Sequence, residues 1–148
     1  MSAMEKFREY AADFEKTFHD DDWSRLKKHF ADDAVYEVLS TVFGCRLVGP
    51  DAIFRGIKKS LDGFDRRFAG REIAIVSVRD ATEDALEVVW EVTYTKEGAP
   101  PFRLRGRTQV ACENDRIVRM ADVYDEAMDR EAAGWLVKHA PDFSLSYV

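Results

Sequence analysis

The carboxylate of Asp122 lies in an apolar segment with period-two alternation, residues 117–125. If this segment is a strand, Val118, Met120, Asp122 and Tyr124 share one face, because successive side chains of a strand point to opposite sides. An acid among apolar neighbours needs either a hydrogen-bond partner or a cavity to line. We expect that Asp122 lines a cavity.

Apolar surroundings raise the pKa of a carboxyl group because desolvation penalises its charged form. A carboxyl group with such a pKa can take a proton from the carbon next to a carbonyl and return it to another atom, with no cofactor and no metal. We assign this acid–base role to Asp122, and we assign hydrogen-bond donation to a developing oxyanion to Tyr36 or Tyr124. The alternative is structural, with Asp122 accepting hydrogen bonds from Tyr36, Trp90 or Thr108 in a polar cluster that only shapes the fold.

A cavity of this kind needs an apolar lining, and the chain contains 10 Phe, 5 Tyr and 3 Trp residues. Most of them must be ordinary core. A binding module would use the others to hold a hydrophobic small molecule without changing it. In a third class, a ligand-free dimerisation domain, aromatic side chains fill the cavity. We expect ligand contacts from Phe14, Phe18, Val38, Phe54, Trp90, Val92, Thr108 and Met120.

Hydrophobic spacing predicts the elements that position these residues. Apolar side chains recur every three or four residues over 4–18 and 23–30, which is typical of one-sided helices. Pro50 opens a third such helix, which Gly63 ends. Strand-like composition or alternation covers residues 34–43, 71–78, 85–95, 102–112 and 117–125. Residues 126–139 can form a last, short helix before Pro141.

This order predicts one α+β domain over residues 1–148. Three N-terminal helices must cover one face of a strongly curved, mainly antiparallel sheet, and together they enclose a cone-shaped pocket. In the hairpin of residues 85–112, the even-numbered side chains are apolar and should face the inside. The outer face carries charges that can pair across the strands, and it is either solvated or the interface of a homodimer: Glu87, Glu91, Arg103, Arg105 and Arg107.

Composition excludes several classes of protein. The formal net charge of −6, with no basic cluster, argues against nucleic acid and anionic membranes. No apolar run approaches the ~20 residues that cross a bilayer, and no signal peptide is evident, so we expect a cytoplasmic protein. Cys45 and Cys112 are far apart and lack metal-type spacing, so we expect two thiols.

Three segments in this order resemble the SnoaL-like branch of the nuclear-transport-factor-two-like superfamily. They are Phe30-Ala31-Asp32-Asp33-Ala34-Val35-Tyr36, Gly49-Pro50-Asp51-Ala52-Ile53 and Asp115-Arg116-Ile117-Val118. The resemblance covers nearly the whole chain and implies the conical α+β pocket, usually in a dimer. It does not choose between enzymes and binding domains, because this fold hosts both.

The catalytic residues of three enzyme types within this superfamily are incomplete here. Ketosteroid isomerases would need a tyrosine at Phe14 and an aspartate at Val38, with a second acid near Arg107 or Thr108. Limonene-epoxide hydrolases would need an arginine and an aspartate where Trp90 and Val92 stand. Scytalone dehydratases use strand histidines, whereas all three histidines here fall on predicted helices or their ends.

Polyketide cyclases of the SnoaL type resemble the chain best, since they use an acid–base aspartate where Asp122 stands. Their supporting histidine and asparagine are not evident here. The resemblance therefore implies an isomerase, cyclase or lyase acting on a hydrophobic carbonyl compound, or a binding domain for a hydrophobic small molecule.

Overall fold

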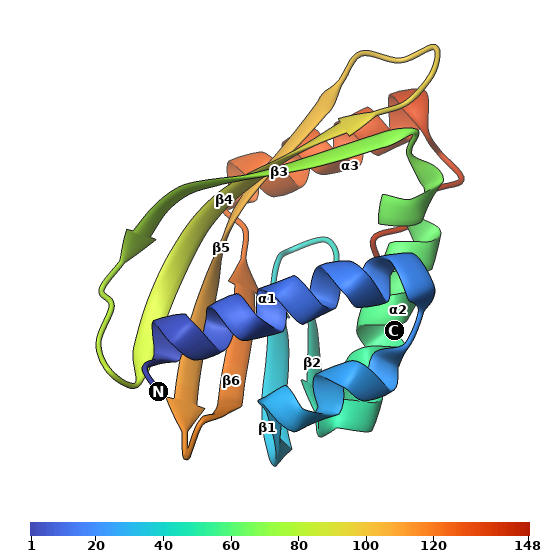
Figure 1. Ribbon diagram of the computed structural model, residues 1–148. Helices are drawn as coiled ribbons and strands as arrows, with labels where there is room; N and C mark the ends of the chain where they lie inside the picture. The colour runs from blue at the N-terminus through green and yellow to red at the C-terminus, as the bar shows by residue number, and fades with distance from the viewer.

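A strongly curved six-stranded sheet, in the order β2-β1-β6-β5-β4-β3, is the frame of the protein (Figure 1). The computed structural model describes residues 1–148. All neighbouring strands are antiparallel except β1 and β6, which are parallel. The strands are β1 (Phe30–Leu39), β2 (Cys45–Val48), β3 (Gly70–Arg79), β4 (Ala85–Thr95), β5 (Phe102–Glu113) and β6 (Arg116–Val123).

Helices cover the concave side and one end of this sheet. Helix α1 crosses the hollow of the sheet in Figure 1, and α2 lies beyond β2. The side chain of Ser2 accepts a hydrogen bond from the Glu5 N–H and forms a capping box that begins α1. The predicted α+β architecture is confirmed. The helical elements are α1 (Ala3–Asp20), η1 (Trp23–His29), α2 (Pro50–Gly63), η2 (Asp65–Arg67) and α3 (Glu126–His139).

Three details differ from the predicted elements. The second helix is a 3-10 helix that ends at His29, so β1 begins at Phe30 and ends at Leu39. The short strand β2 was not predicted, because its four residues are too few to show an alternation. A register shift places Ile117 opposite Cys112, so Ile117 rather than Val118 is the buried residue at the start of β6.

The predicted alternation of the β4–β5 hairpin is confirmed. Every even-numbered residue of β5 is buried, and the odd-numbered ones are exposed or half-buried. On β4, the even-numbered residues are buried except Trp90, which is half-buried. This alternation directs one face of both strands toward α1 and supplies most of one wall of the interior.

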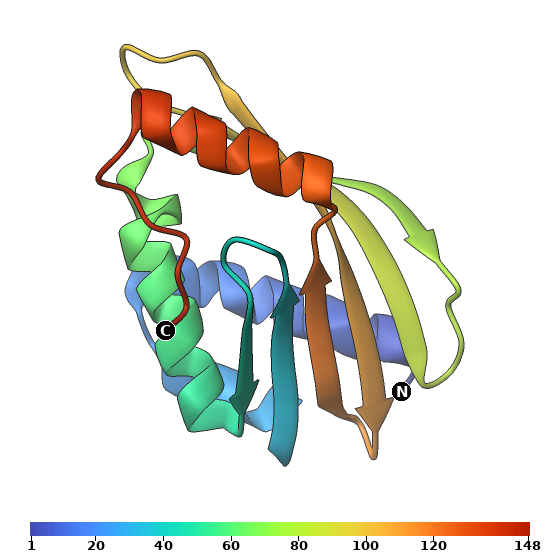
Figure 2. The same cartoon turned by 180° about the vertical axis from the view of Figure 1, so that it is seen from behind.

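Helix α3 lies beside the part of β5 that has no neighbouring strand on that side. Strand β6 ends at Val123, opposite Arg107, so the first half of β5 lacks a partner there. The Arg105 N–H donates to the Met128 Sδ at 3.4 Å, and Trp135 stacks on Phe102 with ring centroids 5.1 Å apart. The helix therefore covers this strand edge, as Figure 2 shows from behind.

No helix is both long and apolar enough to span a membrane. Cys45 and Cys112 are free thiols. No group of three or more His, Cys, Asp or Glu side chains is arranged to hold a metal ion.

Candidate functional site

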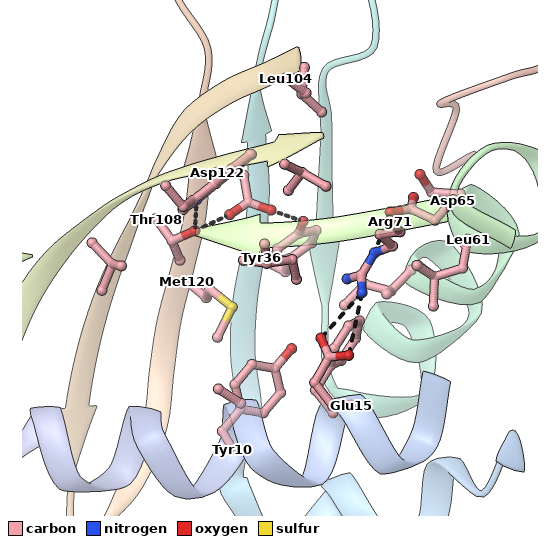
Figure 3. Close-up of a pocket in the computed structure, with 18 of the residues that line it drawn as sticks. Tyr10, Glu15, Tyr36, Leu61, Asp65, Arg71, Leu104, Thr108, Met120 and Asp122 are labelled. Atoms are coloured by element: carbon pink, nitrogen blue, oxygen red, sulfur yellow. Dashed lines mark hydrogen bonds and ion pairs between the residues drawn. The ribbon is translucent and has the colours of Figure 1, made fainter. Parts of the chain in front are cut away.

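A cavity of about 240 Å³ lies between α1, α2 and the concave face of the sheet. Of its 24 lining residues, 18 are hydrophobic, so the few polar groups in its wall stand out. Helix α1 contributes Phe7, Tyr10, Ala11, Phe14 and Glu15. Figure 3 shows the polar groups in two places, around Asp122 on the sheet and around Arg71 nearer to α2.

Both carboxylate oxygens of Asp122 accept a hydrogen bond from a neutral hydroxyl. The Tyr36 hydroxyl donates to Oδ2 at 2.5 Å, and the Thr108 hydroxyl donates to Oδ1 at 2.6 Å (Figure 3). Strand pairing explains this proximity. Thr108 of β5 lies directly opposite Asp122 of β6, and Tyr36 of β1 lies opposite Met120, which is two residues before Asp122 on β6. Asp122 therefore lines the cavity and accepts hydrogen bonds from two of its three candidate partners, Tyr36 and Thr108.

The indole of Trp90 extends this polar chain. Its Nε1–H donates to the Thr108 hydroxyl at 2.9 Å, and its ring meets that of Tyr124 edge-on with centroids 5.8 Å apart. Gly106 makes room for both rings. A Cβ at that position would lie 2.8 Å from Trp90 Cζ2 and 3.1 Å from Tyr124 Cε1, so a larger residue would displace both rings.

Burial raises the pKa of Asp122 above its ordinary value of 3.8. The hydrogen bonds from Thr108 and Tyr36 oppose this shift without reversing it, because they stabilise the carboxylate. Asp122 takes part in none of the ion pairs of the structure, so no cation compensates its charge. Burial also raises the pKa values of Tyr36 and Tyr124 well above the ordinary value, which keeps both hydroxyls protonated as hydrogen-bond donors.

A second polar cluster, formed by Asp65, Arg71, Tyr94 and Glu15, occupies another part of the wall. The Tyr94 hydroxyl donates to Asp65 Oδ2 at 2.8 Å, and Arg71 Nε donates to the same oxygen at 3.2 Å. Arg71 also pairs with Glu15 at 3.3 Å. Burial raises the pKa of Asp65, while Arg71 and Tyr94 act in the opposite direction.

This second cluster was not predicted from the sequence. Arg71 shares the inward parity of Ile73 and Ile75 on β3, so strand alternation carried a signal for it. No such signal existed for Asp65, which begins the short 3-10 helix η2 after α2, or for Glu15, which the helix pattern places among ordinary polar residues.

The C-terminal segment after α3 also lines the cavity, through Leu145 and Tyr147. It runs along α2, where the C-terminus is marked in Figure 2. The Ser60 hydroxyl donates to the Leu145 carbonyl at 3.0 Å, and the Ser144 N–H donates to the Gly63 carbonyl at 2.9 Å. This segment lacks the periodicity of a helix or strand, and its role was not predicted.

Eight of the eleven residues predicted for the site line this one cavity. They are Phe14, Tyr36, Trp90, Val92, Thr108, Met120, Asp122 and Tyr124.

The other three do not line it. Phe18 stacks under the guanidinium group of Arg71, and the Arg71 Cζ atom lies 4.5 Å from the centroid of the Phe18 ring. Val38 is buried in the core. Phe54 packs against the rings of Trp23 and Phe30, with centroids 5.9 and 5.6 Å away, because its face of α2 turns toward η1.

The charged residues of the outer sheet face pair within the chain. Glu87 lies 3.5 Å from Arg107, and Glu91 lies 3.9 Å from Arg103. Arg105 pairs with Glu131 of α3 at 2.9 Å. The homodimer through this face stays a prediction.

Solved structures share this fold at low sequence identity. A nuclear-transport-factor-two-like protein of unknown function from Burkholderia pseudomallei is 18% identical, with a TM-score of 0.68 over 91% of this chain and 98% of that one. A Mycobacterium tuberculosis protein in complex with estradiol-17beta-hemisuccinate is 14% identical, with a TM-score of 0.62 over 86% and 98%. A Catenulispora acidiphila protein with a ketosteroid isomerase-like fold, in complex with trimethylamine, is 20% identical, with a TM-score of 0.55 over 79% and 85%.

No curated protein matches the chain. The family model of the SnoaL-like domain matches residues 9–120, which include α1 from Glu9 onward, the first five strands and β6 up to Met120. Since this match covers well over half of the chain, the chain belongs to the SnoaL-like domain family, and its fold is that of the nuclear-transport-factor-two-like structures.

Proposed function

We propose that this protein binds a compact, hydrophobic carbonyl compound in the cavity and isomerises, cyclises or cleaves it, with Asp122 as the acid–base. The observation that carries the proposal is the environment of Asp122. It is a carboxyl group in a mostly apolar wall, with two neutral hydroxyl donors and no cation. Such a group gains a proton more readily than an ordinary aspartate, which suits proton transfer near neutral pH.

The size of the cavity supports a small ligand. Its volume of about 240 Å³ is below the roughly 300–1,000 Å³ of sites for drug-sized molecules. One or two fused rings suit this space better than a large ligand. The M. tuberculosis and C. acidiphila proteins, which share this fold, are in complex with estradiol-17beta-hemisuccinate and trimethylamine, and these complexes support a small organic ligand.

The proposed reaction begins when the Asp122 carboxylate takes a proton from the carbon next to the substrate carbonyl. The electron pair of the broken C–H bond moves toward the carbonyl oxygen, which becomes an enolate. Protonated Asp122 then needs the Tyr36 hydrogen bond less, so the hydroxyl of Tyr36 or Tyr124 can donate to the enolate oxygen. Asp122 returns the proton to another carbon or to oxygen, which regenerates the carboxylate.

The test uses 2-tetralone, a bicyclic ketone, in D₂O, with NMR to follow hydrogen–deuterium exchange at its α-carbon. The wild-type protein should accelerate this exchange over buffer alone. Asp122→Asn should lower the acceleration about 10²-fold or more, as expected for loss of a general base. Binding, measured by quenching of the intrinsic tryptophan fluorescence, should change by only a few-fold. Tyr36→Phe is the matched control that keeps the acid and removes one donor, and it should slow exchange by less.

A non-catalytic binding module is the second candidate. It is favoured by the fact that both Asp122 oxygens already have donors, which suits a fixed anchor as well as a base. Wild-type protein that binds 2-tetralone without accelerating exchange supports this candidate and contradicts the catalytic proposal. Equal exchange by wild type and Asp122→Asn contradicts it as well.

A further inference from the structure

Strand β3 is a long edge strand with apolar side chains in the open. It is the last strand of the sheet, so the N–H and C=O groups on its outer side have no strand partner (Figure 1). Ile73, Ile75 and Val76 are 45%, 58% and 64% exposed, and no residue from Ile73 to Val78 is charged. Native proteins usually shorten, charge or cover such an edge, since it is a template for pairing with another chain.

A bulge at Val76 changes which side chains of β3 share a face of the sheet. Residues 70–75 pair with β4 in one register and residues 77–79 in another, shifted by one residue at Val76. The shift puts Ile73 and Val78 on the inward face, opposite Val92 and Val88, and puts Glu72 and Arg79 on the outward face. Without the bulge, residues 73 and 78 would lie on opposite faces.

An antiparallel copy of β3, related by a two-fold axis near Val76, therefore fits this edge. Ile73 of each chain would face Val78 of the other, and Glu72 of each chain would face Arg79 of the other. Side chains directly opposite in an antiparallel pair lie on the same face, which the bulge makes possible here. We propose that two copies of this chain associate through their β3 edges in this register and that each copy's strand extends the wall of the other's cavity.

The cavity supports the second half of this proposal. Ile73 and Ile75 line it and yet are 45% and 58% exposed, and Phe7 and Phe14 of α1 are half-buried lining residues across from them. The cavity therefore opens between α1 and β3. The Val78 side chain of a second copy would lie on the inward face beside Ile73, where it would narrow this opening.

The outer sheet face is the competing interface, and its charges are already paired within one chain. Glu87, Glu91 and their arginine partners need no second copy to satisfy them. The unpaired backbone groups and exposed apolar side chains of β3 have no such partner within the chain. We therefore prefer the β3 edge to the outer sheet face as the dimer interface.

The experiment is sedimentation velocity on the full chain over a wide range of concentration, with charge-reversal variants. Wild type should show a monomer–dimer equilibrium. Glu72→Arg and Arg79→Glu should each raise the dimer dissociation constant about tenfold, because each places like charges opposite one another twice per dimer. An equimolar mixture of the two variants should associate as wild type does, since both charge pairs are restored in the mixed dimer.

Two further variants separate the edge from the outer face. Val76→Lys puts a charge beside the two-fold axis and should also weaken the dimer, with faster hydrogen exchange at the amides of residues 72–79. Arg103→Glu on the outer face should leave the dimer unchanged. A wild-type monomer at all concentrations, a dimer broken by Arg103→Glu but not by Val76→Lys, or no recovery in the mixture overturns the proposal.

Discussion

Asp122 combines two properties that rarely occur together, satisfied hydrogen bonds and an uncompensated charge. Tyr36 and Thr108 satisfy its oxygens, but hydroxyl donors offset only part of the free energy lost when a carboxylate leaves water. Burial therefore raises the pKa of Asp122, and folding shifts its protonation equilibrium toward the neutral form. This has a measurable consequence for stability.

The stability of the wild-type protein relative to Asp122→Asn should fall as pH rises. The pKa of Asp122 in the folded protein is above 3.8, so the folded protein binds this proton more tightly than the unfolded chain. The stabilisation from this proton is complete below about pH 4 and is lost as pH rises through the elevated pKa. Urea unfolding of both proteins between about pH 4 and pH 7 measures the difference. A difference that is constant, or that favours wild type at higher pH, contradicts the assignment.

Thr108 is the residue on which the polar chain depends, because its hydroxyl both donates to Asp122 and accepts from Trp90. Thr108→Val should lower the free energy of unfolding by about 1–3 kcal/mol, since it leaves two polar groups without partners. It should also raise the pKa of Asp122 further, because the Thr108 hydrogen bond lowers that pKa. Thr108→Ser keeps the hydroxyl and is the matched control. A loss as large in Thr108→Ser would mean that packing of the methyl group, not the hydrogen bonds, explains the effect.

At the scale of elements, regular periodicity decided what the sequence could predict. Strands β4 and β5 alternate over ten or more residues, so their inward face could be assigned from parity alone. Asp122 was identified because it interrupts such a pattern. The four residues of β2 are too few to show a period. The bulges at Val76 and Val118 change parity locally, and no property of a single residue predicts where a strand will take one.

Two of the residues around Arg71, Asp65 and Glu15, and the C-terminal segment were also missed, because no regular periodicity marks them as part of the site. Asp65 and Glu15 meet Arg71 through the packing of three elements, and the distances between them follow from tertiary structure rather than from spacing in the chain. Tyr147 reaches the cavity from an irregular segment held by Ser60. Strand alternation placed most of the predicted lining residues correctly, whereas Asp65 of the short helix η2, Glu15 of α1 and Tyr147 of the C-terminal segment gave no signal of this kind.

Helix α3 is fastened to the β1–β2 turn by one buried carboxylate. Asp129, 1% exposed, accepts hydrogen bonds from Ser40 Oγ at 2.7 Å, from the Thr41 N–H at 2.8 Å and from Thr41 Oγ1 at 2.9 Å. Asp129→Ala should lower the free energy of unfolding by about 3 kcal/mol, because three donors lose a charged acceptor.

Glu131→Ala on the exposed side of the same helix is the control for this prediction. It removes a surface ion pair with Arg105 and should change the free energy of unfolding by less than about 0.5 kcal/mol. Denaturant titration of the two variants decides. Equal losses would show that α3 contributes through helix propensity rather than through its contact with the turn.

For the molecule as a whole, the cavity is a region where the core is left unfilled. Aromatic clusters pack closely on both sides of it, from Trp23, Phe30 and Phe54 at one end to Phe64, Phe68 and Tyr94 at the other. An open space between such well-packed regions forgoes van der Waals contacts that stabilise the folded state. Stability and ligand binding should therefore oppose each other in this protein.

Ala11 provides the direct test of that opposition, because it is the smallest side chain of α1 in the cavity wall. Ala11→Phe should fill part of the space and raise the free energy of unfolding by about 1 kcal/mol, the usual gain from filling a cavity. It should also weaken binding of 2-tetralone at least about tenfold, because the ligand and the new ring need the same space. Ala12→Phe, on the exposed side of the same helix, changes the same residue type and should do neither. Unfolding curves and fluorescence titrations of both variants measure the two effects. Undiminished binding by Ala11→Phe would place the ligand outside the cavity, and the proposed role of Asp122 would fall with it.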